Sequence, residues 1–449
     1  MGLVDYLRLK IGFRVYSKNH IRAFQFKMIQ KLFFKVQTGS SYYAELNPDG
    51  LKNWDDFYAL PMMDKNILMA QFDRINTLGL KRAEVEAYAL DRESRKEYTG
   101  YFQDRVVVGL SSGTSGNKGL YLTDRALTKR LPFVFLARSG LSLKYLPFRI
   151  LFCLRVFSQG FADINNPLIK LNYLSTMTPI EKVVECINTQ QINILMAPPS
   201  FIRLLIAHRG ALLHPLRCIV SYAEVLTPEE KEKFKNFFHC QVIEIYQASE
   251  GQIASSCKAG NLHLNEELIF AELYDEQGQR VDRPNVAGQL VITNLINEIQ
   301  PLFRYKMNDW VVLKETCPCG SHYQVLDHVI GRQDDVMMFM TKDHHLQHVF
   351  PDLISRWIIT YSNEIREFKA IQSEVNELSL LIDCFDPYPT EKFIHGLHHK
   401  MCEEFKAYEI VPKLKITVTP LVIPKDNSKY KRFEISKEIN HESNLGSRN

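Results

Sequence analysis

The chain has 449 residues, of which 45% are hydrophobic and 24% are charged. These values are ordinary for a soluble globular protein, and the length predicts two or three domains. The formal net charge of +4 is too small to indicate a nucleic-acid-binding protein.

Nine cysteines without the spacing of a small disulfide-rich domain favour reduced thiols and a cytoplasmic protein. No apolar run reaches the length of a membrane-spanning helix, and the N-terminus lacks the order of a signal peptide. The stretch through Lys35 carries eight Lys and Arg residues against Asp5, with aromatic residues between them. A solvated basic face on packing helices is the favoured interpretation, and weak membrane-surface association is the alternative.

In chain order, residues 1–100 are expected to be mainly helical. Apolar residues at helical spacing predict a helix over Ile21–Gln37, and Asp64 is predicted to cap another. The hydrophobic run Val106–Leu110 predicts a buried strand. Residues 111–119 follow with the sequence Ser-Ser-Gly-Thr-Ser-Gly-Asn-Lys-Gly. Such a loop is expected to turn backbone N–H groups toward an anion, here a phosphate, although its pattern is neither a Walker loop nor a Rossmann fingerprint.

Between Leu120 and Gly251, helices alternate with short apolar strands, which predicts an α/β unit with a largely parallel sheet. After Gly251, short strands separated by turns suggest a more antiparallel region. The expected fold class is therefore α/β with parallel or mixed sheets and a distorted antiparallel region, followed by a small α+β domain. The expected domains are residues 1–331, a hinge at 332–335, and a mobile C-terminal domain at 336–449.

Four further stretches carry polar groups suited to a nucleotide. They are Tyr246–Gly251 at the end of a predicted strand, Pro301–Trp310, the boundary segment Gly331–Asp335, and the basic loop Pro424–Arg432. An aromatic ring can stack on a base, a carboxylate can hold Mg²⁺ against phosphates, and an Asp can accept both ribose hydroxyls. Each stretch alone is weak evidence, because solvated loop acids and cationic tails are common.

Taken in this order, the five stretches resemble the adenylate-forming superfamily, in particular its phenylacetate–CoA ligase and coenzyme F390 synthetase-like branch. The resemblance implies that a carboxylic acid attacks Mg·ATP to give an acyl- or aryl-adenylate and pyrophosphate, and that a thiol of CoA or a carrier protein then displaces AMP. Lys429 and Glu250 are implied as catalytic residues. The residues implied to bind the nucleotide are Ser111, Ser112, Gly113, Thr114, Ser115, Gly116, Lys118, Glu224, Tyr246, Ser249, Asp309 and Arg332.

A metal site is a second expectation. A set of three cysteines and one histidine is a known structural Zn²⁺ set, and the branch carries these residue types at the same positions. The expected ligands are Cys257, His263, Cys317 and Cys319, with His322 as a rival fourth ligand.

Several departures from the family pattern leave alternatives open. Gln247, Asn308 and Ser428 replace family glycines, and Val336–Asp343 lacks the glycine that borders the CoA channel. Adenylation is therefore the firmer expectation and transfer to CoA the weaker one. The alternatives are an adenylyltransferase acting on a hydroxyl-bearing acceptor and a non-catalytic nucleotide-binding relative. No nucleic-acid partner and no integral membrane segment are expected, and a homodimer is left open.

Overall fold

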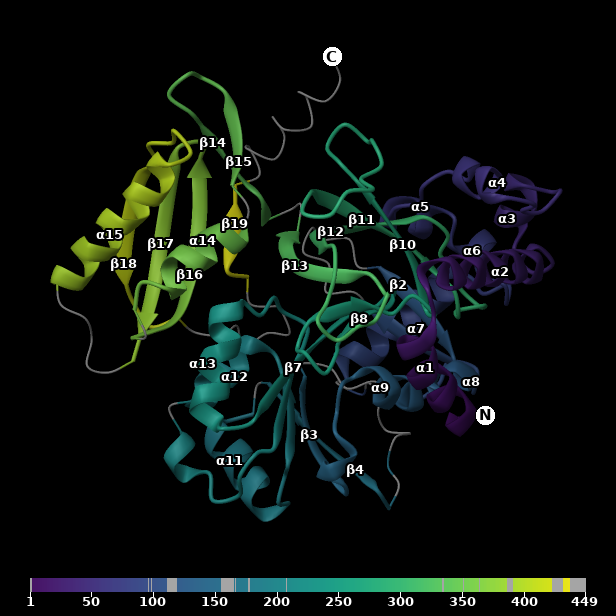
Figure 1. Ribbon diagram of the computed structural model, residues 1–449, viewed down its shortest axis with the longest axis horizontal. Helices are drawn as coiled ribbons and strands as arrows, with labels where there is room; N and C mark the ends of the chain where they lie inside the picture. The colour runs from purple at the N-terminus through teal and green to yellow at the C-terminus, as the bar shows by residue number, and fades with distance from the viewer. Residues whose placement is uncertain are drawn as a thin grey trace.

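The computed structural model describes residues 2–95, 97, 99–110, 119–154, 165, 167–176, 178–206, 208–332, 335–349, 351–362, 364–385, 391–421 and 431–436. Within these residues the chain forms a large α/β part and a smaller C-terminal part that lies beside it (Figure 1). None of the described helices is long and apolar enough to cross a membrane.

The large part is built on one sheet of eleven strands in the order β10-β11-β12-β13-β9-β8-β7-β6-β5-β3-β4. Its parallel half confirms the predicted strand–helix alternation. The strands of this half are β3 (Phe148–Leu154), β4 (Ile169–Ser175), β5 (Ile194–Ala197), β6 (Cys218–Ser221) and β7 (Gln241–Ala248). Its helices are α11 (Ile180–Thr189), α12 (Pro199–Ile206) and α13 (Pro228–Phe238).

Strand β7 joins the two halves of the sheet, because it is parallel to β6 and antiparallel to β8. The predicted change of character after Gly251 is thus confirmed. The antiparallel strands are β8 (Gly251–Ser256), β9 (Leu262–Leu264), β10 (Ile269–Tyr274), β11 (Ala287–Asn294), β12 (Tyr305–Lys314) and β13 (Val325–Arg332).

The N-terminal helices gather around the antiparallel half of the sheet (Figure 1). Apolar side chains of α2, α3 and α4 enter the same core as β9–β12. Asp64 caps α5 as predicted, since its carboxylate accepts the N–H of Ile67 at 2.9 Å. The helices are α1 (Gly2–Val15), α2 (Lys18–Gln37), α3 (Ser41–Leu46), α4 (Trp54–Ala59), α5 (Lys65–Ala70), α6 (Phe72–Ile75), α7 (Arg82–Ser94), α8 (Arg125–Thr128) and α9 (Leu131–Arg138).

The expectation of a buried strand at Val106–Leu110 was wrong in part. Strand β1 (Val106–Leu110) pairs with β2 (Leu120–Asp124) as a two-stranded antiparallel hairpin outside the main sheet. Only Val106 of β1 is fully buried, and Val107, Gly109 and Leu110 border a cleft.

The C-terminal part has its own hydrophobic core, formed by residues from Met337 to Phe433. It comprises the hairpin β14 (Met337–Met340) and β15 (Leu346–Val349), a four-stranded sheet β18-β17-β16-β19, and two helices. Gly331 at the end of β13 has φ of +149°, and a Cβ there would lie 2.9 Å from Cγ of Pro351. The other elements are α14 (Pro351–Ile359), β16 (Ile365–Glu374), β17 (Glu377–Cys384), α15 (Glu391–Lys406), β18 (Lys413–Val418) and β19 (Phe433–Ile435).

Candidate active site

A cleft of about 1410 Å³ lies between the two parts of the chain. The large part contributes the ends of β6, β7 and β12, and the small part contributes Glu367 on β16 together with Lys431 and Arg432. The predicted residues that border the cleft are Glu224, Tyr246, Ser249, Glu250 and Asp309. The structure therefore brings these five residues to one place.

Glu250 lies in the turn between β7 and β8 and is held by two neighbours. The Tyr121 hydroxyl on β2 donates to Glu250 Oε1 at 2.6 Å, and Asn294 Nδ2 donates to the Glu250 carbonyl at 2.7 Å. The Tyr121 and Tyr305 hydroxyl oxygens are 3.0 Å apart. Burial, reinforced by the Glu250 carboxylate, raises the pKa of Tyr121, so its hydroxyl stays protonated and donates. The result is a positioned carboxylate at the cleft.

Tyr246 and Asp309 meet across the sheet, since the Tyr246 hydroxyl donates to Asp309 Oδ2. Asp309 is also the direct cross-strand partner of Arg332 in the β12–β13 ladder. Tyr246 and Asp309 thus both line the cleft, and the backbone of Arg332 pairs beside Asp309 in the sheet. A stacked arrangement of Tyr246 with a base stays a prediction.

Glu224 follows β6 and faces the start of α12. Its two carboxylate oxygens accept the N–H of Ser200 at 3.0 Å and the Ser200 hydroxyl at 2.7 Å. The carboxylate thus ties the β6–α13 turn to the first turn of α12. The preceding residue, Ala223, has φ of +67°, a left-handed conformation that favours glycine.

Other predicted residues lie outside the described residues. These are the glycine-rich loop positions Ser111–Gly116 and Lys118, and the lysine at position 429. Residues of β1 and β2, on either side of the loop, line the cleft. Arg432, three positions after Lys429, borders the cleft as well.

Arg304 precedes β12 and is buried. Its guanidinium contacts Glu272 at 3.3 and 3.2 Å and donates to the carbonyls of Tyr58 and Leu60, the latter at 2.7 Å. The carboxylate that pairs with Arg304 is therefore that of Glu272, inside the core.

Four charged side chains form a buried cluster where the two parts of the chain meet. Arg203 on α12 pairs with Glu230 on α13 and reaches Glu367 of the small part at 2.5 Å. Arg432 of the small part contacts Glu367 at 2.8 Å and Glu230 at 3.6 Å. The side chains of Arg203 and Glu230 are 7% and 1% exposed, so these charges depend on one another for stabilisation.

The predicted metal-binding residues converge at one buried position. The ligand atoms of Cys257, His263, Cys317 and Cys319 all lie within 4.8 Å of one another. Sγ of Cys257 is 3.7 Å from Sγ of Cys317, and Sγ of Cys319 is 3.4 Å from Nε2 of His263. His322 is exposed and stands outside this set.

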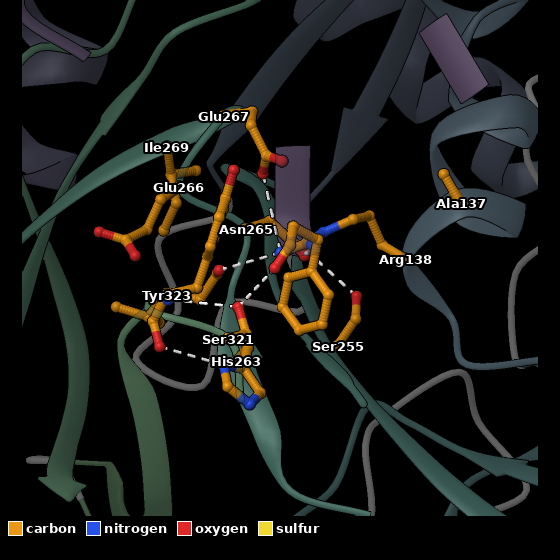
Figure 2. Close-up of polar contacts among 12 residues, drawn as sticks. Ala137, Arg138, Ser255, His263, Asn265, Glu266, Glu267, Ile269, Ser321 and Tyr323 are labelled. Carbon is orange, nitrogen blue, oxygen red and sulfur yellow. Dashed lines mark hydrogen bonds and ion pairs between the residues drawn. The ribbon is translucent and has the colours of Figure 1, made fainter. Parts of the chain in front are cut away.

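The surroundings fix the imidazole of His263. Its Nδ1 lies 3.1 Å from the carbonyl of Tyr323, and Figure 2 shows this contact beneath the side chain of Arg138. That hydrogen bond turns Nε2 toward the thiols. Burial lowers the pKa of His263 to about 4, so the ring is neutral near pH 7, the form that binds a metal. The donor set and its second contacts fit a tetrahedral metal site.

Sequence reasoning missed Tyr121, Asn294 and the four-charge cluster. Tyr121 stands two residues after the glycine-rich loop, and alternation along β2 was the available signal that it shares the cleft side. The charge cluster had no local signal, because Arg203 and Glu367 are separated by 164 positions.

No protein-family model matches the chain. A phenylacetate–coenzyme A ligase of Thermus thermophilus is 22% identical over 177 residues, which are 35% of this chain. The chain spans 38% of the length of that relative.

Two solved structures of 2-hydroxyisobutyryl-CoA ligase are similar over nearly the whole chain. Each is 15% identical, and the match covers 98% of this chain and 94% of the ligase. The TM-score is 0.70 for the postadenylation state with 2-HIB-AMP and 0.57 for the thioesterification state with 2-HIB-AMP and CoA. The chain therefore has the two-part fold of the adenylate-forming acid–CoA ligases.

Proposed function

We propose that this protein activates a carboxylic acid with ATP as an acyl- or aryl-adenylate, and that a thiol then accepts the acyl group. The observation that carries this proposal is the convergence of Glu250, Tyr246 and Asp309 on one cleft bordered by both parts of the chain. Positioned carboxylates and an aromatic side chain in such a cleft suit Mg·ATP.

Each group has a proposed role that follows from its chemistry. Glu250 offers carboxylate oxygen, the ligand type that Mg²⁺ prefers, and Tyr121 fixes its orientation. Asp309, with Arg332 beside it in the ladder, would hold the ribose hydroxyls. The glycine-rich loop would bind the phosphates, and Lys429 would stabilise negative charge that develops during adenylation.

The arrangement of the two parts supports assignment of this conformation to the adenylation step. The TM-score is higher with the postadenylation state than with the thioesterification state of the same ligase, and this difference supports the assignment. We propose residues 332–335 as the hinge, because β13 ends there and the separate C-terminal core begins at Met337.

The test is ATP–pyrophosphate exchange across a panel of aromatic and medium-length carboxylic acids. Exchange should depend on one class of acid, and Lys429→Ala should reduce it by at least about a hundredfold. Lys425→Ala in the same basic segment is the matched control and should leave exchange within about twofold. Exchange that requires a hydroxyl-bearing acceptor instead of an acid would contradict the proposal, and so would an unchanged rate in Lys429→Ala.

We further propose that Cys257, His263, Cys317 and Cys319 bind a structural Zn²⁺. The separations of 3.7 and 3.4 Å agree with tetrahedral Zn²⁺, for which ligand atoms stand about 3.3–3.8 Å apart. Metal analysis of purified protein should find about one zinc per chain. Cys317→Ser should lose it, whereas Cys240→Ser, at another partly buried thiol, should retain it. Wild-type protein without zinc would refute the assignment.

A further inference from the structure

Helix α1 carries apolar side chains on two opposite sides. Inward, Leu9 is buried and the ring of Phe13 lies edge-on to His263 with centroids 5.0 Å apart. A second set points away from the protein and forms an outer stripe that nothing in the described chain covers. Its members Val4, Leu7, Ile11 and Val15 are 68%, 49%, 55% and 65% exposed.

The spacing makes this outer stripe continuous. At about 100° per residue, positions 4, 7, 11 and 15 fall within one narrow arc of the helix surface. Arg8 lies at one margin of that arc and Arg14 at the other, and both are exposed. A surface helix that faces water normally carries polar residues along the middle of its outer face. The outer face of α1 has the reverse order, with apolar residues in the middle and arginines at the edges.

The charge around α1 indicates what covers the stripe. The stretch through Lys35 has eight Lys and Arg residues and only Asp5, a formal charge of +7, whereas the whole chain carries +4 and the remainder therefore −3. A two-fold contact with a second copy would bring Arg8 and Arg14 against the same groups of the other chain. An anionic surface would pair with these arginines.

We propose that the outer face of α1 docks on the surface of an anionic lipid bilayer. The outer stripe enters the boundary of headgroups and acyl chains, and Arg8 and Arg14 contact lipid phosphates at its two margins. The helix lies in the plane of the surface and does not span it.

Contacts with α9 fix the position of α1, with its outer face turned away from the protein. Lys10 Nζ donates to the carbonyl of Ala137 at 3.4 Å, and the Arg138 guanidinium lies 4.2 Å from the centroid of Phe13. Figure 2 shows Arg138 extending from α9 toward Asn265 in the core, which anchors this junction. The same helix α9 lines the cleft with Leu131, Phe135 and Leu136. Docking would therefore place the cleft one helix away from the lipid.

The test is flotation of the full-length protein with vesicles of phosphatidylcholine alone or mixed in equal parts with phosphatidylglycerol. Wild-type protein should float with the anionic vesicles, and added salt should weaken this binding. Leu7→Ser with Ile11→Ser should reduce binding roughly thirtyfold, because two half-exposed side chains lose their lipid contact. Arg8→Gln with Arg14→Gln should reduce it by a similar factor, about fivefold for each charge.

The matched control is Leu213→Ser with Val411→Ser, which removes two apolar side chains elsewhere that are at least as exposed and should bind like wild type. Thermal unfolding should be the same for all variants, because every changed side chain is exposed. Equal flotation of wild type and Leu7→Ser with Ile11→Ser would overturn the proposal. The proposal would also be overturned if the wild-type protein did not float but sedimented as a dimer, and if Leu7→Ser with Ile11→Ser abolished that dimer. That result would assign the face to a second copy of the chain.

Discussion

From the buried charge cluster we predict that Arg203→Met slows adenylation and does not slow thioester formation. The Arg203 side chain is 7% exposed and joins Glu230 of its own part to Glu367 of the small part. Removal of one partner from a buried ion pair costs about 3–5 kcal/mol. Glu230 belongs to the large part, so its contact with Arg203 does not depend on the position of the small part. About half of the cost, roughly 2 kcal/mol, is therefore assigned to the contact between the two parts.

A penalty of about 2 kcal/mol corresponds to roughly a thirtyfold loss of the arrangement seen here. Single-turnover release of pyrophosphate from ATP and the acid should slow by up to that factor. Thioester formation from preformed acyl-adenylate should not slow, because it follows rearrangement of the parts. Arg280→Met is the control, since its partner Asp282 is 68% exposed and surface pairs contribute at most about 1 kcal/mol.

A second change tests the electrostatic cause. Arg203→Met leaves the carboxylates of Glu230 and Glu367 with Arg432 as the cation that both contact. In the double variant, Glu367→Gln removes one of these two carboxylates, so it should restore part of the lost rate. The reasoning fails if Arg203→Met adenylates as fast as wild type. It also fails if the effects of Arg203→Met and Glu367→Gln on the adenylation rate simply add in the double variant, because additive effects would mean that the two residues act independently.

Three further outcomes are expected. Tyr121→Phe removes the hydrogen bond that fixes Glu250, so half-maximal adenylation should need roughly tenfold more Mg²⁺ in a titration at saturating ATP. Ala223→Gly should raise the free energy of unfolding by about 1 kcal/mol in urea denaturation, since φ of +67° strains alanine and suits glycine. Burial raises the pKa of Glu266 to about 7, although its carboxylate accepts two hydrogen bonds from Gln324. The proton that the folded protein holds on Glu266 therefore stabilises the fold fully below about pH 4.5, and this contribution is lost as the pH rises through 7. Glu266→Gln should flatten that decline, of up to about 3 kcal/mol, in denaturation curves between pH 5 and 8.

Local sequence patterns predicted the elements whose folding depends on nearby residues. Thr227 and Glu230 form the capping box that begins α13, a signal contained in four successive positions. The apolar runs at β5 and β6 are strands because both faces of a parallel sheet are covered. By contrast, Val106–Leu110 has the composition of a covered strand and lies in a hairpin beside the cleft. Composition alone does not tell what a strand faces.

The candidate site shows the same division. Tyr246 and Glu250 are close in sequence, so their common location follows from a single strand end. The Tyr121–Glu250 contact joins positions 129 residues apart and depends on where the β1–β2 hairpin docks. The metal ligands were predicted through family resemblance, since the Cys-x-Cys spacing at Cys317 carries little information by itself. Contacts that form only through tertiary packing leave no periodic pattern in the sequence from which they could be predicted.

The bonds of Arg304 set a limit on how far the chain can be shortened. Its guanidinium takes two of its acceptors from the carbonyls of Tyr58 and Leu60, and its own carbonyl accepts the N–H of Met63 at 3.0 Å. The first sixty residues therefore pack against β12, the strand that carries Tyr305 and Asp309, and hold it in place. A minimal version that begins near the glycine-rich loop would expose a buried cation and release that strand, so miniaturisation of this protein must proceed from other segments.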